Sequence, residues 1–201
     1  MKKTAWILIV CLAILVSLVP LTYIHPNTTS GFLELKEEVV LKNTAWWTNF
    51  YLHIFSGGIA LLVGWVQFSK KIRKNYLQWH RTLGKLYVVS ALICGFTGVF
   101  VGFYAYGGIV AQLGFVSVGC IYFYTTLMAY LYIKNNNIVG HQTMMIYSYA
   151  ACLAAVTLRL YGPLLTVGLG DYTTAYRIVA WLSWVPNLLI ARRISRGIIV
   201  S

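Results

Sequence analysis

Acidic residues are almost missing from this sequence. Asp and Glu together number 4, against 16 Lys and Arg, and only 10% of the 201 residues are charged, whereas 59% are hydrophobic. Soluble globular domains carry about 25% charged residues. The composition therefore predicts an integral membrane protein. The sequence also lacks a Gly-rich phosphate loop, a Ser-His-Asp arrangement and a pair of carboxylates in any apolar stretch, which excludes most hydrolases and carboxylate-based proton relays.

Cysteine is sparse, and none of it lies in a loop. Cys11, Cys94, Cys120 and Cys152 all fall inside apolar segments, with no paired spacing. This pattern indicates neither a disulfide framework nor a thiolate metal site. We expect these residues to be buried as small hydrophobic side chains.

The net charge of +12 has two explanations. Basic chains often bind nucleic acid, but cytoplasmic loops of membrane proteins also carry excess Lys and Arg. Here most basic residues fall on the side of the N-terminus, and all four acidic residues fall on the other. We therefore expect a multi-pass protein of the cell membrane with no nucleic-acid partner. The run Lys70-Lys71-Ile72-Arg73-Lys74 predicts contact with anionic lipids of the inner leaflet.

Apolar stretches of about 20 residues predict the membrane-spanning helices, because a helix of that length crosses the hydrocarbon core. The sequence predicts an all-α helical bundle with six transmembrane helices and both termini cytoplasmic. The stretches are about 5–23, 47–68, 82–104, 108–132, 142–167 and 174–190.

These stretches divide the chain into four parts. Residues 1–24 resemble a signal peptide without a clear cleavage site, so we interpret them as an uncleaved signal-anchor helix. An extracytoplasmic loop follows over 25–46, and a five-helix membrane core over 47–190. Residues 191–201 are predicted to be a basic cytoplasmic tail.

Three of the stretches carry a histidine on a face of small residues. Side chains three or four residues apart share one helix face. Small residues let membrane helices approach closely, and an ionisable group among them points into the bundle. The sets are His53, Gly57, Ala60 and Gly64; His80, Gly84, Tyr87, Ala91, Gly95, Gly98 and Gly102; and His141, Met145, Ser148, Cys152, Ala155, Arg159 and Gly162.

Depth sorts the polar groups into two tiers. His80 and His141 each begin a helix after a cytoplasmic loop, so both are expected near the inner surface. His53 and Arg159 are expected toward the outer surface. If these three helices are neighbours, the inner tier holds a histidine pair and the outer tier a histidine with an arginine.

The inner pair has two interpretations. Neutral imidazoles from facing helices can bind a b-type haem or a transition metal, which makes His80 and His141 candidate ligands. Alternatively, they hydrogen-bond loop carbonyls or lipid phosphates.

His53 and Arg159, the residues expected toward the outer surface, also have more than one interpretation. His53 is either a functional group or a core histidine satisfied by a neighbouring helix. Arg159 either snorkels to outer phosphates or binds an anionic substrate, a quinone oxygen or a haem propionate. Together they form a candidate outer polar site.

Four sequence features together resemble the bacterial membrane protein family called domain of unknown function 2306, over about residues 47 to 190. The resemblance implies a multi-span membrane protein and names no reaction. The features are His53 with Gly57-Gly58 and Gly64; His80-Arg81-Thr82-Leu83-Gly84-Lys85-Leu86-Tyr87; His141 with Met145, Ser148-Tyr149 and Thr157-Leu158-Arg159; and Trp184-Val185-Pro186-Asn187.

Three functional hypotheses remain. The leading one is a membrane redox protein that binds haem or a metal through His80 and His141. The second is a permease for a small anionic or amphipathic molecule, with His53 and Arg159 as its outer site. The third is an assembly factor whose small-residue faces contact a larger membrane complex.

Overall fold

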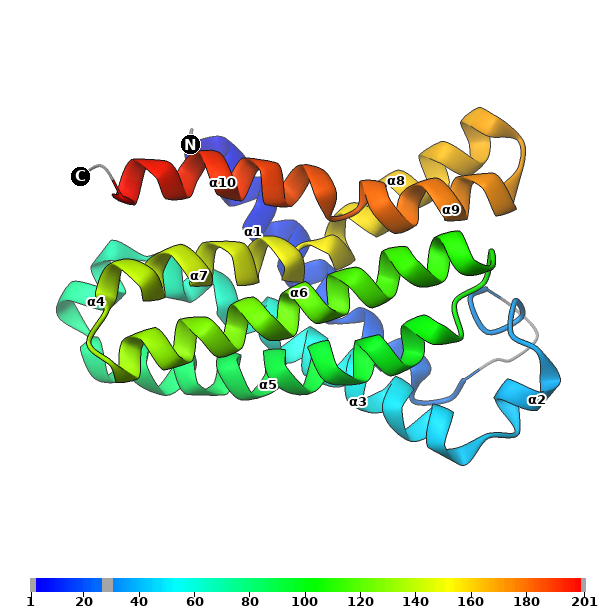
Figure 1. Ribbon diagram of the computed structural model, residues 1–201, viewed down its shortest axis with the longest axis horizontal. Helices are drawn as coiled ribbons and strands as arrows, with labels where there is room; N and C mark the ends of the chain where they lie inside the picture. The colour runs from blue at the N-terminus through cyan, green and yellow to red at the C-terminus, as the bar shows by residue number, and fades with distance from the viewer. Residues whose placement is uncertain (1–2, 27–30, 200–201) are drawn as a thin grey trace.

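Figure 1 shows the computed structural model of the protein, which describes residues 3–26 and 31–199. Every regular element of these residues is helical, which confirms the predicted all-α class. The helices are α1 (Lys3–Ser17), η1 (Val19–Tyr23), α2 (Glu38–Leu41), α3 (Thr44–Gly64), η2 (Trp65–Phe68), α4 (Lys70–Asn75), α5 (Leu77–Phe103), α6 (Ile109–Lys134), α7 (Ile138–Cys152), α8 (Ala154–Leu169), α9 (Tyr172–Leu182) and α10 (Val185–Ile199), where η marks a 3-10 helix.

Five helical segments are long and apolar enough to cross a membrane, and they match the first five predicted stretches. The sixth stretch is not one helix, because α9 ends at Leu182 and α10 begins at Val185. Six spans with cytoplasmic termini therefore stay a prediction. Figure 1 places the end of α10 and helix α4 at one end of the bundle and α2 at the other. The five segments are Thr4–Tyr23, Thr44–Phe68, Leu77–Phe103, Ile109–Lys134 and Ile138–Leu169.

Polar side chains cap the starts of three helices. Asn43, Asn137 and Asp171 accept hydrogen bonds from backbone N–H groups in the first turns of α3, α7 and α9. Such caps satisfy N–H groups that have no partner within the helix. Hydrogen bonds from the Thr174 side chain and from the N–H groups of Thr174 and Thr173 hold the pKa of Asp171 below its ordinary value.

Helices α3, α5, α6 and α7 form the core of the bundle, in which α5 packs closely on both α3 and α6. Glycine permits the closest approaches between α5 and α6. A Cβ atom on Gly95 would lie 2.9 Å from the Phe123 nitrogen, and one on Gly119 would lie 3.0 Å from the Val99 nitrogen. The small-residue face predicted for α5 is therefore a helix-packing face.

The fifth membrane-spanning segment and the sixth predicted stretch are each interrupted. Helix α7 passes into α8 through Leu153, and α9 into α10 through Ser183 and Trp184. In consequence α7 packs on α10, whereas α8 packs mainly on α9. Figure 1 shows α8 turning away from the line of α7.

Asn187 joins the two interruptions. Its amide nitrogen lies within hydrogen-bonding distance of the Ser183 carbonyl (3.0 Å), the Thr157 hydroxyl (3.2 Å) and the Ala150 carbonyl (3.3 Å). Thr157 also donates to the Ser183 carbonyl. Pro186 lies in the first turn of α10, where a missing N–H group removes no intrahelical hydrogen bond. The Asn187 and Thr157 side chains instead satisfy the Ser183 carbonyl at the break.

The segment before α3, predicted to be an extracytoplasmic loop, is anchored to the core by a buried lysine. Lys36 is only 8% exposed, and its ammonium group donates to the Tyr104 carbonyl at the end of α5. The same nitrogen lies 4.6 Å from the Phe32 ring centroid and 5.8 Å from that of Trp46. A cation suits a helix C-terminus and an aromatic face. Burial nevertheless lowers the pKa of Lys36 to about 8.

Candidate functional site

His80 is held by Gln67 at the inner end of the core. The orientation of the Gln67 amide is assigned from its hydrogen-bonding partners. In that orientation its nitrogen donates to His80 Nδ1 (3.0 Å) and to the His80 carbonyl (3.2 Å), and its oxygen accepts from the Gly84 N–H group (3.2 Å). Nδ1 is therefore an acceptor, so neutral His80 carries its proton on Nε2.

His141, in the first turn of α7, has the opposite tautomer. Its Nδ1 atom lies 2.9 Å from the Ala129 carbonyl, which can only accept, so Nε2 keeps a lone pair. The two histidines precede Tyr87 and Ser148 by two helical turns, and those hydroxyls are 2.7 Å apart. A charge on His141 acts unfavourably on a charge at His80. The two histidines therefore lie at a similar depth in the bundle.

In the outer tier, His53 of α3 contacts α5. His53 Nδ1 lies 2.9 Å from the Cys94 carbonyl and 3.5 Å from Cys94 Sγ, and the imidazole packs over Gly98 of α5. Because a carbonyl accepts, Nδ1 carries the proton and Nε2 is free. The charge of Arg159 acts on His53 from α8. Gln67 lies 14 residues along the chain from His53, so the tiers are separated by roughly 20 Å.

Arg159 is the charged residue of the outer tier, and it has no acidic partner among the described residues. Its guanidinium group donates to the carbonyl of Ala155, one turn earlier in α8, at 2.9 Å, and its side chain is exposed. Among the residues that the structure describes, the one ion pair joins Lys42 to Glu38, on the outer loop. The remaining guanidinium donors are therefore available to an anion or a lipid phosphate.

Protein side chains fill the space beside the core glycines. A Cβ atom on Gly64 would lie 2.5 Å from the Tyr149 ring and 2.8 Å from the Tyr87 ring, and one on Gly84 would lie 3.2 Å from the Gln67 side-chain amide. These glycines make room for aromatic rings and an amide. They leave no space for a macrocycle at those positions.

A layer of hydroxyl groups lies between the two tiers. Tyr87, Ser148 and Thr126 are each 0% exposed, and the Ser148 hydroxyl lies 2.7 Å from both of the others. The Tyr122 and Tyr149 hydroxyls are also buried, and neither has a hydrogen-bond partner within the described ranges.

Sequence reasoning missed three of these polar residues. Gln67 follows Gly64 by three residues and so extends the helix face that begins with His53. This spacing could have predicted that Gln67 lies on the same face. Thr126 lies on α6, which contains no histidine, so nothing in the sequence indicated a polar site on that helix. Asn187 appeared only within the family resemblance, without a role.

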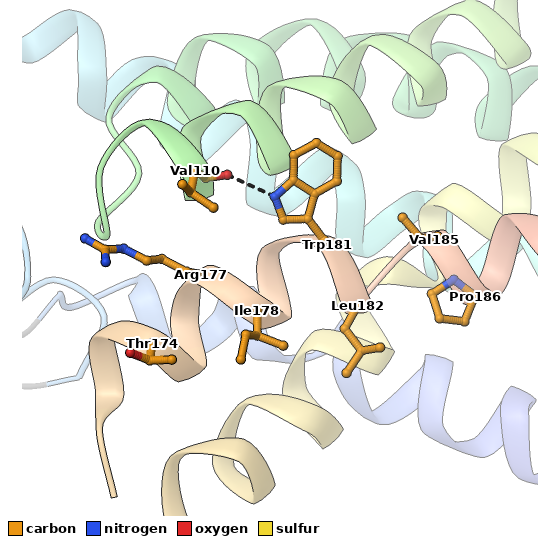
Figure 2. Close-up of a pocket in the computed structure, with 8 residues that line it drawn as sticks. All are labelled: Val110, Thr174, Arg177, Ile178, Trp181, Leu182, Val185 and Pro186. Atoms are coloured by element: carbon orange, nitrogen blue, oxygen red, sulfur yellow. Dashed lines mark hydrogen bonds between the residues drawn. The ribbon is translucent and has the colours of Figure 1, made fainter. Parts of the chain in front are cut away.

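One surface groove, of about 460 Å³, lies where α9 meets the start of α6. Figure 2 shows Trp181 donating its Nε1–H to the Val110 carbonyl at 3.0 Å, with Ile178 and Leu182 beside it. Thr174 and Arg177 are its only polar side chains apart from the indole N–H. The lining is mainly hydrocarbon, which suits an acyl chain better than a polar ligand.

Comparison with known proteins gives one family. Residues 50–194 match the family described as "Predicted membrane protein (DUF2306)". No curated protein and no solved structure shows significant similarity to the chain.

Proposed function

The chain belongs to the DUF2306 family of predicted membrane proteins, and we propose that it is a permease that moves a small anion together with a proton. The observation that carries this proposal is the guanidinium group of Arg159. It lies in a segment long and apolar enough to span a membrane, and its one hydrogen bond to a described residue goes to its own helix. The one ion pair among the described residues lies elsewhere. Ionisable groups at such depths commonly mark substrate or ion pathways.

His53 supplies the coupling to protons. Its Nδ1–H group is fixed on the Cys94 carbonyl, so Nε2 is the atom that takes up a proton. The nearby charge of Arg159 opposes a second positive charge there. An anion between the two side chains removes that repulsion, so anion and proton favour each other's binding to the same extent.

The interrupted helices supply the moving part. The breaks at Leu153 and at Ser183–Trp184 separate α8 and α9, on the side of Arg159, from α7 and α10. Discontinuous helices commonly form the substrate sites of transporters. In this proposal α8 and α9 tilt together about the two breaks while the core stays packed.

The test is anion-dependent stabilisation of the purified protein. Ligands that bind the folded state raise its unfolding temperature. We expect acetate, succinate or phosphate to stabilise the wild type, and to do so more strongly as the pH falls, because anion binding and proton binding at His53 favour each other. Arg159→Gln should abolish the effect, and His53→Gln should remove its pH dependence.

Arg177→Gln is the matched control, because Arg177 is also exposed on the outer side and its Nε atom donates to a backbone carbonyl, that of Gly107. Equal losses in the Arg159 and Arg177 variants would show that general positive charge, not this site, attracts the anion.

A haem or metal held by His80 and His141 is the second candidate function. Both rings use Nδ1 for contacts within the protein, which is how ligand histidines are commonly oriented. A metal at His80 Nε2 requires the Gln67 contact to change, because that nitrogen carries the proton. Absorption spectra of oxidised and reduced protein from haem-replete cells test this candidate: a Soret band lost in His80→Ala or His141→Ala would establish it.

We also propose that the inner surface contacts anionic lipid of the cytoplasmic membrane. A groove of about 260 Å³ is lined by Arg192, Arg193 and Arg196 together with Leu189 and Ile190. The arginines can bind a lipid phosphate, and the apolar side chains beside them can contact its acyl chains. Binding of phosphatidylglycerol in preference to phosphatidylcholine, reduced by neutralising the three arginines, is the expected result. Equal binding of both lipids would contradict it.

A further inference from the structure

One face of α9 lines the surface groove that this helix forms with the start of α6. The lining residues of α9 and of the first turn of α10 recur every four residues in two rows, so they share that face. We call this surface the α9 groove. The two rows are Thr174, Ile178 and Leu182, and Arg177, Trp181 and Val185.

The wall of the α9 groove is hydrocarbon, because its indole donor is already used. The Nε1–H group of Trp181, the only donor of that side chain, is bonded to the Val110 carbonyl at 3.0 Å (Figure 2). Ile178, Trp181 and Leu182 are 40%, 37% and 36% exposed. The groove is therefore open to the surrounding bilayer, whose hydrocarbon chains suit a wall that offers water no hydrogen bonds.

The groove has about the depth of one leaflet. Thr174 and Leu182 are eight residues apart, which is ~12 Å along a helix axis, and Val185 and Pro186 continue the lining beyond Leu182. One leaflet of hydrocarbon is ~15 Å thick. Figure 1 places the start of α9 at the same end of the bundle as α2, the predicted outer side. The groove thus runs from that surface toward the middle of the membrane.

A cation lies at the surface end of the groove. The Nε atom of Arg177 donates to the Gly107 carbonyl at 2.7 Å, which leaves the four N–H groups of the two terminal nitrogens. Asp171 acts on this charge from the start of α9, but its carboxylate oxygens cap that helix. The one ion pair within the described ranges lies elsewhere. The guanidinium group therefore suits an anion at the membrane surface.

We propose that the α9 groove binds one phospholipid, with its phosphate on Arg177 and one acyl chain along α9 as far as Pro186. Guanidinium groups bind phosphate oxygens bidentately, and a phospholipid carries its phosphate at the surface end of its chains, as the groove requires. The inference goes beyond the proposed function, because this lipid is not the transported anion. A free anion lacks the acyl chain, so Arg177→Gln remains a control for the Arg159 site.

The test is photo-crosslinking of the purified protein in a mild non-ionic detergent. Phosphatidylglycerol with a diazirine in one acyl chain is the probe, and mass spectrometry identifies the labelled peptides. The competitors are ordinary phosphatidylglycerol, diacylglycerol with the same chains but no phosphate, and glycerol phosphate, which has no chains. Labelling at Leu164, which is 70% exposed on α8, measures non-specific contact.

We expect phosphatidylglycerol to displace the label from the α9 groove at about tenfold lower concentration than diacylglycerol, a ratio that corresponds to ~1.4 kcal/mol. At Leu164 the two lipids should act equally. Arg177→Gln should remove the preference, and Lys42→Gln, which removes another exposed positive charge, should keep it. Ile178→Trp should reduce labelling of the groove because it fills the wall, whereas Leu164→Trp should not.

Equal displacement by phosphatidylglycerol and diacylglycerol in folded wild type would overturn the inference, as would a preference that survives Arg177→Gln. Displacement by glycerol phosphate alone would also overturn it, because the site would then bind free phosphate. Anion-dependent stabilisation and its loss in Arg159→Gln are measured without lipid, so failure of the lipid site and failure of the proposed function are distinguishable.

Discussion

Adding one methyl group at Gly64 tests whether the core is as closely packed as the contacts indicate. The new Cβ atom of Gly64→Ala would lie 2.5 Å from Tyr149 Cε2, 2.7 Å from Tyr149 Cδ2 and 2.8 Å from Tyr87 Cε2. Neither ring has room to retreat, because Tyr87 is 0% and Tyr149 3% exposed. The Tyr87 hydroxyl is also tied to Ser148.

The magnitude follows from two opposing effects. Alanine favours a helix over glycine by about 1 kcal/mol. Overpacking a close-packed core costs about 1–3 kcal/mol or more, and contact with two rings at once places Gly64→Ala at the upper end. We expect net destabilisation of about 2 kcal/mol. Gly162→Ala on α8 is the control, because nothing lies within 4 Å of its new Cβ atom, so it should gain up to about 1 kcal/mol.

The assay is unfolding of the purified variants in mild detergent, followed by near-ultraviolet circular dichroism. Tyr149→Leu in the Gly64→Ala background should recover part of the loss, because it removes the closest ring, and the double-mutant cycle measures that coupling. If Gly64→Ala were as stable as Gly162→Ala, the space beside Gly64 would be open. The argument that protein side chains fill the histidine faces would then fail.

Three further changes test the peripheral contacts. Asn187→Ala should destabilise the protein by about 1–3 kcal/mol in the same assay, because buried carbonyls lose their donor; an unchanged midpoint would show that the breaks need no clamp. The unfolded chain holds the Lys36 proton to higher pH than the folded protein, so wild-type stability should rise between about pH 8 and pH 10. Lys36→Met should flatten this rise and Lys42→Met should not; parallel curves for all three proteins would contradict it. The pKa of Asp171 is also lowered in the folded protein, so its contribution likewise rises with pH, but in the acid range. Its carboxylate should stabilise α9 at neutral pH and lose that effect in acid, and Asp171→Ala should remove this part of the acid dependence of helix content.

Much of the arrangement was predictable from residue spacing. Steps of three and four residues placed His53, His80 and His141 on buried faces, since an apolar segment hides its small and ionisable residues from lipid. The depth argument likewise placed His80 with His141 and His53 with Arg159. In the structure the charges of each pair act on one another, and a functional role for either pair stays a prediction.

The partners of these residues were not predictable in the same way. A single Gln, Thr or Asn in an apolar helix barely changes its hydropathy, and its partner lies on another helix. Gln67 fixes the His80 tautomer across a turn, and Thr126 joins Ser148 across the bundle. Spacing within one helix cannot reveal such a contact, because it depends on how two helices are rotated against each other.

The split of the sixth stretch has the same origin. Hydropathy over 174–190 is continuous, and Pro186 alone does not decide between a bend and an interruption. The decision comes from Asn187, which bonds the Ser183 carbonyl and reaches Thr157 on α8. Thr157 lies two residues before Arg159, so the contact that stabilises the break also fixes the rotation of α8 and the direction of the guanidinium group. The Pro186-Asn187 and Thr157-Leu158-Arg159 segments, far apart in sequence, are thus one structural unit.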